Sequence, residues 1–209
     1  MRNTLVIALI AVAIPCAAQG KQLTLEGLLS VPFPDGLVAA PAGGAVAWTF
    51  DEAGSRNVWV ARPPDYKARK VTSYSGDDGQ EITELTFTPD GNAIAYVRGG
   101  SANGRGEIPN PALDVEGETQ AVWLVPLSGG APRRVGEGHS PAIAGDRIAF
   151  VKGGEIWSAS LRDTTAATQL MHTRGHPSDL RWSPKGDKLA FTSDRGDHGF
   201  IGVYDASSK

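Results

Sequence analysis

The segment Gly138-His139-Ser140-Pro141-Ala142 is the nearest approach in this sequence to the nucleophile turn of a serine hydrolase. In that turn a serine stands where a strand meets a helix, and the next residue gives its backbone N–H to the oxyanion. Pro141 has no N–H to give, and no helical pattern follows it. We therefore interpret Ser140 as a loop residue at the start of a repeat, and we predict no catalytic residue in the chain.

Metal and cofactor motifs are equally weak. Possible cation ligands form two groups, Asp77 with Asp78 and Asp194 with Asp197 and His198. Neither group has the spacing of a calcium-binding loop, and acidic residues in turns commonly accept hydrogen bonds from their own backbone. Gly136-Glu137-Gly138 begins a dinucleotide fingerprint, but the third glycine and a surrounding βαβ unit are missing. The sequence predicts no metal ion and no cofactor.

The elements that would position any site form a repeated unit, clearest between Leu180 and Asp205. Leu180–Trp182 reads as a short strand, and Ser183–Gly186 reads as a tight turn because Pro184 presets φ and a glycine closes it. Residues 188–192 alternate polar and apolar as a half-buried strand does. Residues 200–204 are rich in aromatic and β-branched side chains, which favour a third strand. The unit is an antiparallel meander.

This unit recurs three times upstream. Taking Ala47, Ala95, Ala149 and Ala190 as equivalent, the copies are ~40–55 residues apart, which is typical of propeller blades in the manner of WD repeats. We therefore predict an all-β fold, a partial β-propeller of four-stranded antiparallel blades. About four blades are expected, and the last one lacks its outer strand.

The expected domain organisation follows from these repeats. Residues 1–18 form a signal peptide, 19–37 an N-terminal segment and 38–209 the partial propeller, with blades at about 38–73, 82–136, 140–172 and 179–209. Within the N-terminal segment, Thr24 could cap a short helix. The second blade contains one long insertion, residues 99–119, which is rich in glycine, proline and asparagine. Loops of that length in compact domains are usually functional or disordered, so the insertion is a candidate contact site for a substrate or a second domain.

The N-terminus has the features of an export signal. Arg2 precedes an apolar run at residues 5–14 that is too short to span a membrane, and Cys16-Ala17-Ala18 predicts cleavage after Ala18. Pro15 stands where a lipoprotein signal has a small residue, which disfavours lipid attachment at Cys16. We expect a periplasmic or secreted protein, free of the membrane after cleavage and without disulfides, since Cys16 is the only cysteine.

Composition excludes some partners. The formal net charge is −3, and the densest basic run, residues 67–70, falls on an expected outer strand, where lysine is common at an exposed edge. No nucleic-acid partner is therefore expected. Five tryptophans recur at matching strand positions: Trp48, Trp59, Trp123, Trp157 and Trp182. We interpret them as core between blades rather than as a sugar-binding platform.

Several phrases together resemble one family. They are SPKGDKLAFTSDRGDHGFIGVYD, LTFTPDGNAIAYVRGG and VTSYSGDDGQEITEL, together with the start LTLEGLLSVPFPDGLVAAP. The combination is similar to the N-terminal propeller of exported bacterial serine peptidases of the prolyl oligopeptidase family, in the branch of dipeptidyl-peptidase IV and acylaminoacyl-peptidase.

The resemblance implies that the propeller admits short peptides to a C-terminal α/β-hydrolase domain that carries the catalytic triad. Neither that domain nor the paired glutamates of dipeptidyl peptidases can be matched in these 209 residues, so no catalytic residue is carried over. The expected partners are a peptide substrate and the hydrolase domain, and the complete enzyme would be a serine-type peptidase. Two alternatives are a freestanding Tol-like periplasmic propeller that binds proteins, and a propeller glycosidase or lectin.

Overall fold

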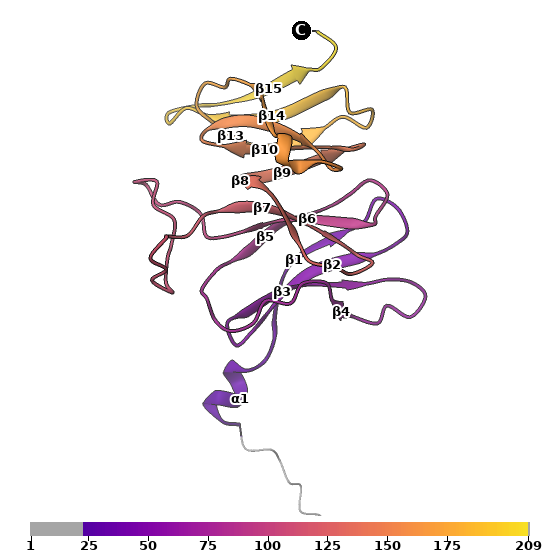
Figure 1. The fold of residues 1–209 in the computed structure, drawn as a ribbon, viewed down its shortest axis with the longest axis vertical. Helices are drawn as coiled ribbons and strands as arrows, with labels where there is room; N and C mark the ends of the chain where they lie inside the picture. Colours follow the sequence, from indigo (N-terminus) through magenta and orange to yellow (C-terminus); the bar gives the residue numbers. More distant parts are fainter. Residues whose placement is uncertain (1–22, 209) are drawn as a thin grey trace, which may run out of the picture.

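The computed structural model describes residues 23–208, so the predicted signal peptide lies outside the described residues. Four antiparallel sheets follow one another along the chain and stack in that order (Figure 1). The first sheet contains β1 (Phe33–Ala39), β2 (Val46–Glu52), β3 (Ser55–Ala61) and β4 (Arg69–Lys70). The second contains β5 (Ile82–Phe87), β6 (Ala93–Arg98), β7 (Ala121–Pro126) and β8 (Arg133–Glu137).

The third sheet contains β9 (His139–Ala144), β10 (Arg147–Lys152), β11 (Glu155–Ser160) and β12 (Thr168–Met171), and the fourth contains β13 (His176–Trp182), β14 (Lys188–Asp194) and β15 (Gly199–Asp205). Within the described residues the fourth sheet thus has three strands, as predicted. The helical elements are α1 (Leu25–Leu29) and the 3-10 turn η1 (Thr164–Ala166). Thr24 caps α1, since its Oγ1 accepts a hydrogen bond from the Gly27 N–H at 3.0 Å. Neither helical element is long or apolar enough to cross a membrane.

The predicted turn chemistry is confirmed in the second and fourth sheets. The N–H of Gly91 donates to Thr88 O and the N–H of Gly186 donates to Ser183 O, both at 2.8 Å. Both glycines have φ of 68°, a backbone region that side chains with a Cβ rarely adopt. Each turn therefore reverses the chain between the first and second strands of its sheet.

The sheets are held together by a repeated pairing of small and large side chains. The second strands carry the four equivalent alanines, and Ala47, Ala95 and Ala149 are fully buried. Tyr96 lies in the same cluster as Ala47, which joins the first two sheets. Phe150 likewise lies with Ala95, and Phe191 with Ala149. An alanine of one sheet thus leaves room for an aromatic ring of the next, which fixes the spacing of neighbouring blades.

The hydroxyl group of Tyr96 makes a polar contact inside the protein. Its hydroxyl lies 2.6 Å from the hydroxyl of Tyr74, whose ring is covered by the Arg98 guanidinium at 4.4 Å. Burial raises the pKa of the Tyr96 hydroxyl, the Tyr74 hydroxyl raises it further, and Arg98 opposes them. Burial likewise raises the pKa of Tyr74. The pair joins β6 to the loop that leads into the second sheet.

We expect Tyr96→Phe to lower the free energy of unfolding by about 1 kcal/mol at pH 7, because one buried hydrogen bond is lost. The folded state keeps the tyrosine proton to a higher pH than the unfolded chain, in which tyrosine titrates near pH ~10. The stability of the unaltered protein should therefore fall as the pH rises above that value, and the fall should be smaller in Tyr96→Phe. Urea denaturation at neutral and alkaline pH measures both effects, and parallel pH profiles for the two proteins would refute the assignment.

Candidate functional site

The first strands of the four sheets lie next to one another along one side of the stack, and we call them the inner strands. Each of them contains a β-bulge. β1 contacts β5, β5 contacts β9 and β9 contacts β13. Their pairing with the second strands is interrupted once in each sheet. At each interruption one residue has a left-handed backbone: Gly36 (φ 65°), Glu84 (φ 53°), Ser140 (φ 54°) and Asp179 (φ 51°). Bulges bend a strand and change the direction of a side chain. The side chains at these positions therefore do not follow the regular alternation between the two faces of the sheet.

A cavity of about 260 Å³ lies between the four inner strands, and three of the bulge residues line it. Glu84 comes from β5, Ser140 from β9 and Asp179 from β13, while Val38 of β1 and Arg181 of β13 also lie on its walls. The lining combines two carboxylates, a hydroxyl and a guanidinium. Such a cavity can bind charged or hydrogen-bonding groups of a ligand. We refer to it below as the inner cavity.

Hydrogen bonds between neighbouring sheets, and one within the fourth sheet, position this lining. The Glu84 carboxylate accepts a hydrogen bond from the Ser140 backbone N–H, which joins the second and third sheets. The Trp182 indole N–H donates to Ala142 O at 3.2 Å, which joins the third and fourth sheets. The Thr192 hydroxyl contacts Asp179 Oδ2 at 3.3 Å. The walls of the inner cavity are therefore preorganised by contacts between blades.

Ser140 lies in β9 rather than in a loop before the third blade, so that part of the sequence interpretation is wrong. The sequence was misleading because Gly138 and Pro141 stand close to Ser140, and glycine and proline at such spacing are typical of a turn. Its Oγ lies 3.0 Å from His139 Nδ1, but Glu84 bonds to the Ser140 backbone and not to the histidine ring. A triad needs the carboxylate on the imidazole and a backbone N–H after the serine. Neither condition is met.

We expect the purified chain to hydrolyse a nitrophenyl ester no faster than buffer does, and Ser140→Ala to leave that rate unchanged. The physical reason is that neither an oriented base nor an oxyanion donor accompanies the hydroxyl. Initial rates at several protein concentrations measure this directly. Turnover that scales with protein and is lost in Ser140→Ala would contradict it.

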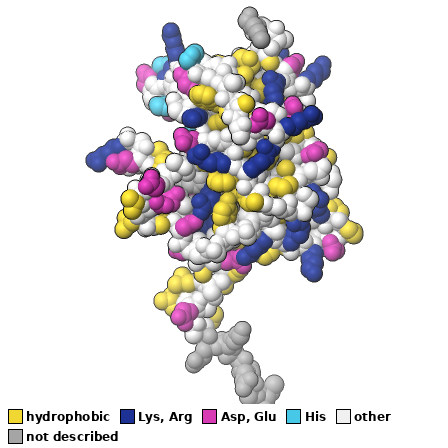
Figure 2. Space-filling model, viewed as in Figure 1, with side chains coloured by type: hydrophobic (Ala, Val, Ile, Leu, Met, Phe, Trp, Pro, Cys, Tyr) yellow, Lys and Arg dark blue, Asp and Glu magenta, His cyan; other side chains and the backbone are white. Residues whose placement is uncertain are grey.

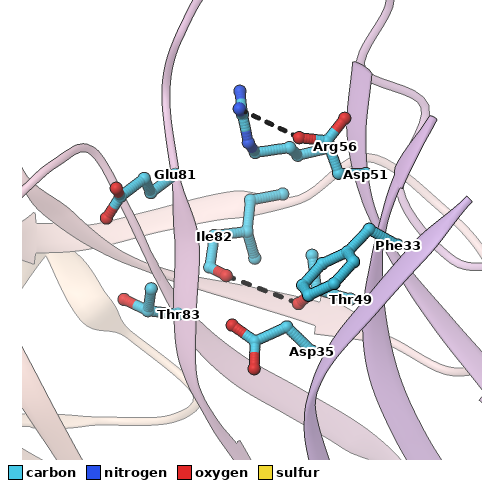
Figure 3. Close-up of a pocket in the computed structure, with 8 residues that line it drawn as sticks. All are labelled: Phe33, Asp35, Thr49, Asp51, Arg56, Glu81, Ile82 and Thr83. Carbon is cyan, nitrogen blue, oxygen red and sulfur yellow. Dashed lines mark hydrogen bonds and ion pairs between the residues drawn. The ribbon is translucent and has the colours of Figure 1, made fainter. Parts of the chain in front are cut away.

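A second pocket, of about 220 Å³, opens between the first and second sheets (Figure 3). Asp51 and Arg56 form an ion pair at 2.9 Å on one side of it. Asp35, next to the bulge of β1, and Glu81, just before β5, lie on separate elements around it (Figure 3). The Thr49 hydroxyl donates to Ile82 O at 3.4 Å and connects the two sheets behind the pocket. This opening is therefore rich in carboxylates, with one guanidinium as counter-ion.

The insertion at residues 99–119 contains no strand in the structure and folds back on the loop before β5. Gln80 Nε2 donates to Pro109 O at 3.5 Å. A Cβ on Gly79 would lie 2.1 Å from Pro111 Cγ, so the two segments pack closely. Farther out, Leu113 and Val115 are 82% and 96% exposed. The insertion is anchored at its base and presents apolar side chains to solvent, but no structural contact identifies what it binds.

The candidate metal ligands are used in other ways. Asp77 lies 3.7 Å from Arg56, and Asp78 pairs with Arg98. Asp194 Oδ1 accepts a hydrogen bond from the Gly196 N–H at 2.8 Å. Within residues 23–208 no group of three or more histidine, cysteine, aspartate or glutamate side chains is placed to hold a metal ion.

Comparisons with known proteins identify the architecture. No protein-family model matches the chain, and no curated protein matches it. Among solved structures, a putative TolB from Agrobacterium tumefaciens is 17% identical with a TM-score of 0.54, and the match covers 85% of this chain and 60% of that one. A puromycin-hydrolysing peptidase from Mycobacterium tuberculosis is 16% identical with a TM-score of 0.58, covering 84% and 28% of the two chains. The fold is a β-propeller.

A structure of prolyl endopeptidases is also similar to this propeller, with 11% identity, a TM-score of 0.61 and coverage of 87% of this chain and 29% of that chain. The propeller spans less than two thirds of each of these three chains. At such low identity the likeness establishes the fold alone, and it extends equally to propellers of the TolB and peptidase types.

The sequence analysis did not predict that the bulge residues form one site. A signal was present, because in three of the four inner strands a polar residue directly precedes a buried apolar one: Glu84-Leu85, Ser140-Pro141 and Asp179-Leu180. Aligning the repeats on their first strands rather than on the alanines of the second strands would have brought these positions together.

Proposed function

We propose that this chain is the substrate-admitting propeller of an exported serine peptidase that cleaves short peptides. The observation that carries the proposal is the inner cavity, in which Glu84, Ser140 and Asp179 come from three successive blades. A propeller supplies a passage rather than a nucleophile, so the catalytic serine, histidine and acid would belong to an α/β-hydrolase domain. The resemblance of the sequence to propellers of such peptidases supports this division of roles.

Within this proposal the carboxylates of the inner cavity contact the cationic amino terminus of a peptide. Glu84 and Asp179 are exposed to the cavity, and a charge-assisted hydrogen bond to an ammonium group is stronger than a neutral one. The acidic pocket at Asp35, Asp51 and Glu81 adds negative charge at the junction of the first two blades. Peptides with a free amino terminus would be favoured over acetylated ones.

The test looks for an α/β-hydrolase sequence encoded downstream of Lys209 and joins this chain to it. The fusion is expected to cleave short peptides and to exclude a folded protein substrate, whereas the hydrolase domain alone should lose this discrimination. The double substitution Glu84→Gln and Asp179→Asn should raise KM for free amino-terminal peptides roughly tenfold, the equivalent of about 1.4 kcal/mol. An unchanged KM would remove the inner cavity from substrate binding. The absence of any hydrolase sequence or activity would refute the peptidase role.

A freestanding Tol-like propeller that binds another periplasmic protein is the second candidate. It is supported by the likeness of this fold to the putative TolB structure. It predicts a saturable complex with a folded periplasmic protein and no peptidase activity in any fusion. The same fusion experiment therefore separates the two candidates.

A further inference from the structure

A groove of about 640 Å³ opens between the second and third sheets. It is lined by the start of β6 and the end of β7, whereas the insertion connects the other ends of these two strands. Its floor is apolar: Leu124 belongs to the hydrophobic core between the two sheets, and Ala93 and Leu161 pack against that core. Both sheets therefore contribute to the floor. We call this opening the interblade groove.

Charged side chains of the second sheet stand at two separate places along the groove. Asp90 lies in the turn between β5 and β6, and Arg133 is the first residue of β8. The order β5-β6-β7-β8 places two strands between them. Because neighbouring strands are about 4.8 Å apart, the two charges are separated by roughly 10–15 Å. The second sheet thus gives the groove a negative end and a positive end.

The third sheet adds little net charge to the groove. Asp146 and Arg162 line this wall and face each other at 3.9 Å, so their charges offset one another. Over the middle of the stack, Figure 2 shows hydrophobic side chains at the surface with lysine and arginine side chains beside them. Apolar contact and cationic contact are therefore available to a ligand on the same part of the molecule.

The Arg133 guanidinium is held in place without being neutralised. Its Nη1 donates to Thr164 Oγ1 of η1 at 3.3 Å, which fixes the side chain across the junction with the third sheet. Among residues 23–208 no carboxylate oxygen lies within 4.0 Å of its nitrogens. The closest influence is on Asp163, whose pKa is lowered mainly by hydrogen bonds from Thr165 and only slightly by Arg133. A half-buried guanidinium beside an apolar floor favours an anionic group of a ligand.

Asp90 is equally well fixed and keeps capacity for one more donor. Its Oδ1 accepts hydrogen bonds from the Thr88 hydroxyl at 2.6 Å and the Asn92 N–H at 3.0 Å, and its Oδ2 accepts one from Asn92 Nδ2 at 3.1 Å. The bonds from Thr88 and Asn92 lower the pKa of Asp90, which therefore stays ionised at neutral pH. A carboxylate has about four acceptor positions. Oδ2 can thus accept a hydrogen bond from a cationic donor of a ligand.

We propose that the interblade groove binds a short apolar peptide with free ends, its ammonium group at Asp90 and its carboxylate at Arg133. Extended residues span about 3.3–3.6 Å each, so three or four residues bridge the two charges. The apolar side chains lie on Ala93, Leu124 and Leu161 and remove that floor from water. A fatty acid carries one charge and would leave Asp90 without a counter-ion. The groove shares no lining residue with the inner cavity, and the proposal does not depend on the peptidase role.

The test titrates the purified chain with the tripeptide Val-Ala-Leu in an isothermal titration calorimeter at low salt. Saturable binding at one site is expected. Acetylation of the peptide amino terminus and amidation of its carboxyl terminus should each weaken binding about tenfold, because each removes one charge-assisted contact. The absence of saturation up to about 1 mM peptide would overturn the proposal.

Two substitutions assign each end of the peptide to its own residue. Arg133→Gln should weaken binding of the free tripeptide about tenfold and leave binding of the amidated form unchanged. Asp90→Asn keeps an acceptor for the turn and should remove the preference for a free amino terminus over an acetylated one. Equal effects on free and capped peptides would show that neither side chain contacts a terminus, and would overturn the proposal.

The matched control for Arg133→Gln is Arg134→Gln. Arg134 is the next residue of β8, so its side chain lies on the opposite face of the strand, and it does not line the groove. It should leave the affinity unchanged. Ala131→Trp provides a second variant if Arg133→Gln fails to fold, because Ala131 is an exposed residue of the groove wall and a large ring there should block binding.

The inner cavity also contains carboxylates, so the same titration is repeated on the double variant Glu84→Gln and Asp179→Asn. Unchanged affinity supports the interblade groove as a separate site, whatever the outcome of the peptidase experiment. Loss of binding in this double variant, with full binding in Arg133→Gln and Ala131→Trp, would place the peptide in the inner cavity and overturn the proposal.

Discussion

Gly138→Ala is expected to lower the free energy of unfolding by about 4 kcal/mol or more. Gly138 has φ of 130°, and a Cβ at this position would lie 1.9 Å from the carbonyl oxygen of Val151. The obstacle is backbone in β10, so the clash cannot be relieved by turning a side chain. The N–H of Gly138 also donates to Gln120 O at 2.9 Å, next to the pairing of Ala121 with Glu137, and a shift of this residue would break that bond where the second sheet leads into the third.

The matched control is Gly153→Ala. Gly153 also has a left-handed backbone, with φ of 59°, but no atom lies within 4 Å of the Cβ that the substitution would add. Only backbone strain is introduced, which costs about 1 kcal/mol. Chemical denaturation of the two variants gives the difference. Equal losses at both positions would show that the close approach of β10 is not what requires glycine at position 138.

Phe150→Ala is expected to lower the free energy of unfolding by about 3–5 kcal/mol, because it removes a ring that no solvent reaches. The ring fills the space beside Ala95 and lies against Gly136, where a Cβ would come within 3.1 Å of it. A cavity would form between the second and third sheets. The second and third sheets each also pack against another sheet, so we expect the loss of stability to extend beyond one strand.

The control for this substitution is Phe200→Ala. Phe200 lies in β15 and is 47% exposed, so its removal should cost about 1 kcal/mol or less. Thermal or urea unfolding of the two variants shows how much more stability is lost with a ring buried between sheets than with an exposed ring. A small loss for Phe150→Ala would mean that the alanine–aromatic pairing is not the main contact between blades.

The architecture was predictable because its determinants are local. The Thr88–Gly91 and Ser183–Gly186 turns each contain proline and a closing glycine, and these residues set the chain reversal regardless of the surrounding fold. Side chains alternate along each second strand, so the equivalent alanines all lie on the face toward the next sheet. The aromatic residue after each alanine lies on the opposite face, toward the previous sheet. The two residue types that meet at each interface are therefore visible in the sequence pattern.

The candidate site was not predictable in the same way. Glu84, Ser140 and Asp179 line one cavity only because their strands carry bulges and their sheets stack. A bulge shifts the pairing register by one residue, and a polar residue followed by an apolar one is too common in strands to specify that shift unless the repeats are aligned on their first strands. The base of the insertion was also missed, since the fit of Gly79 against Pro111 depends on two loops separated by a whole strand hairpin.

The sheets contact one another only in sequence order: every sizeable contact between sheets in the described part of the chain joins a blade to the one before or after it. In such a linear array, stability resembles a sum of nearest-neighbour terms. The first and fourth blades have one neighbour each, whereas the second and third have two. We therefore expect the backbone amides of β6 and β10, whose sheets each pack between two described sheets, to exchange their hydrogens more slowly than those of surface loops such as the insertion. The Glu84 and Ser140 walls of the inner cavity belong to these two middle blades, so this part of the cavity is expected to keep its shape when loops around it open.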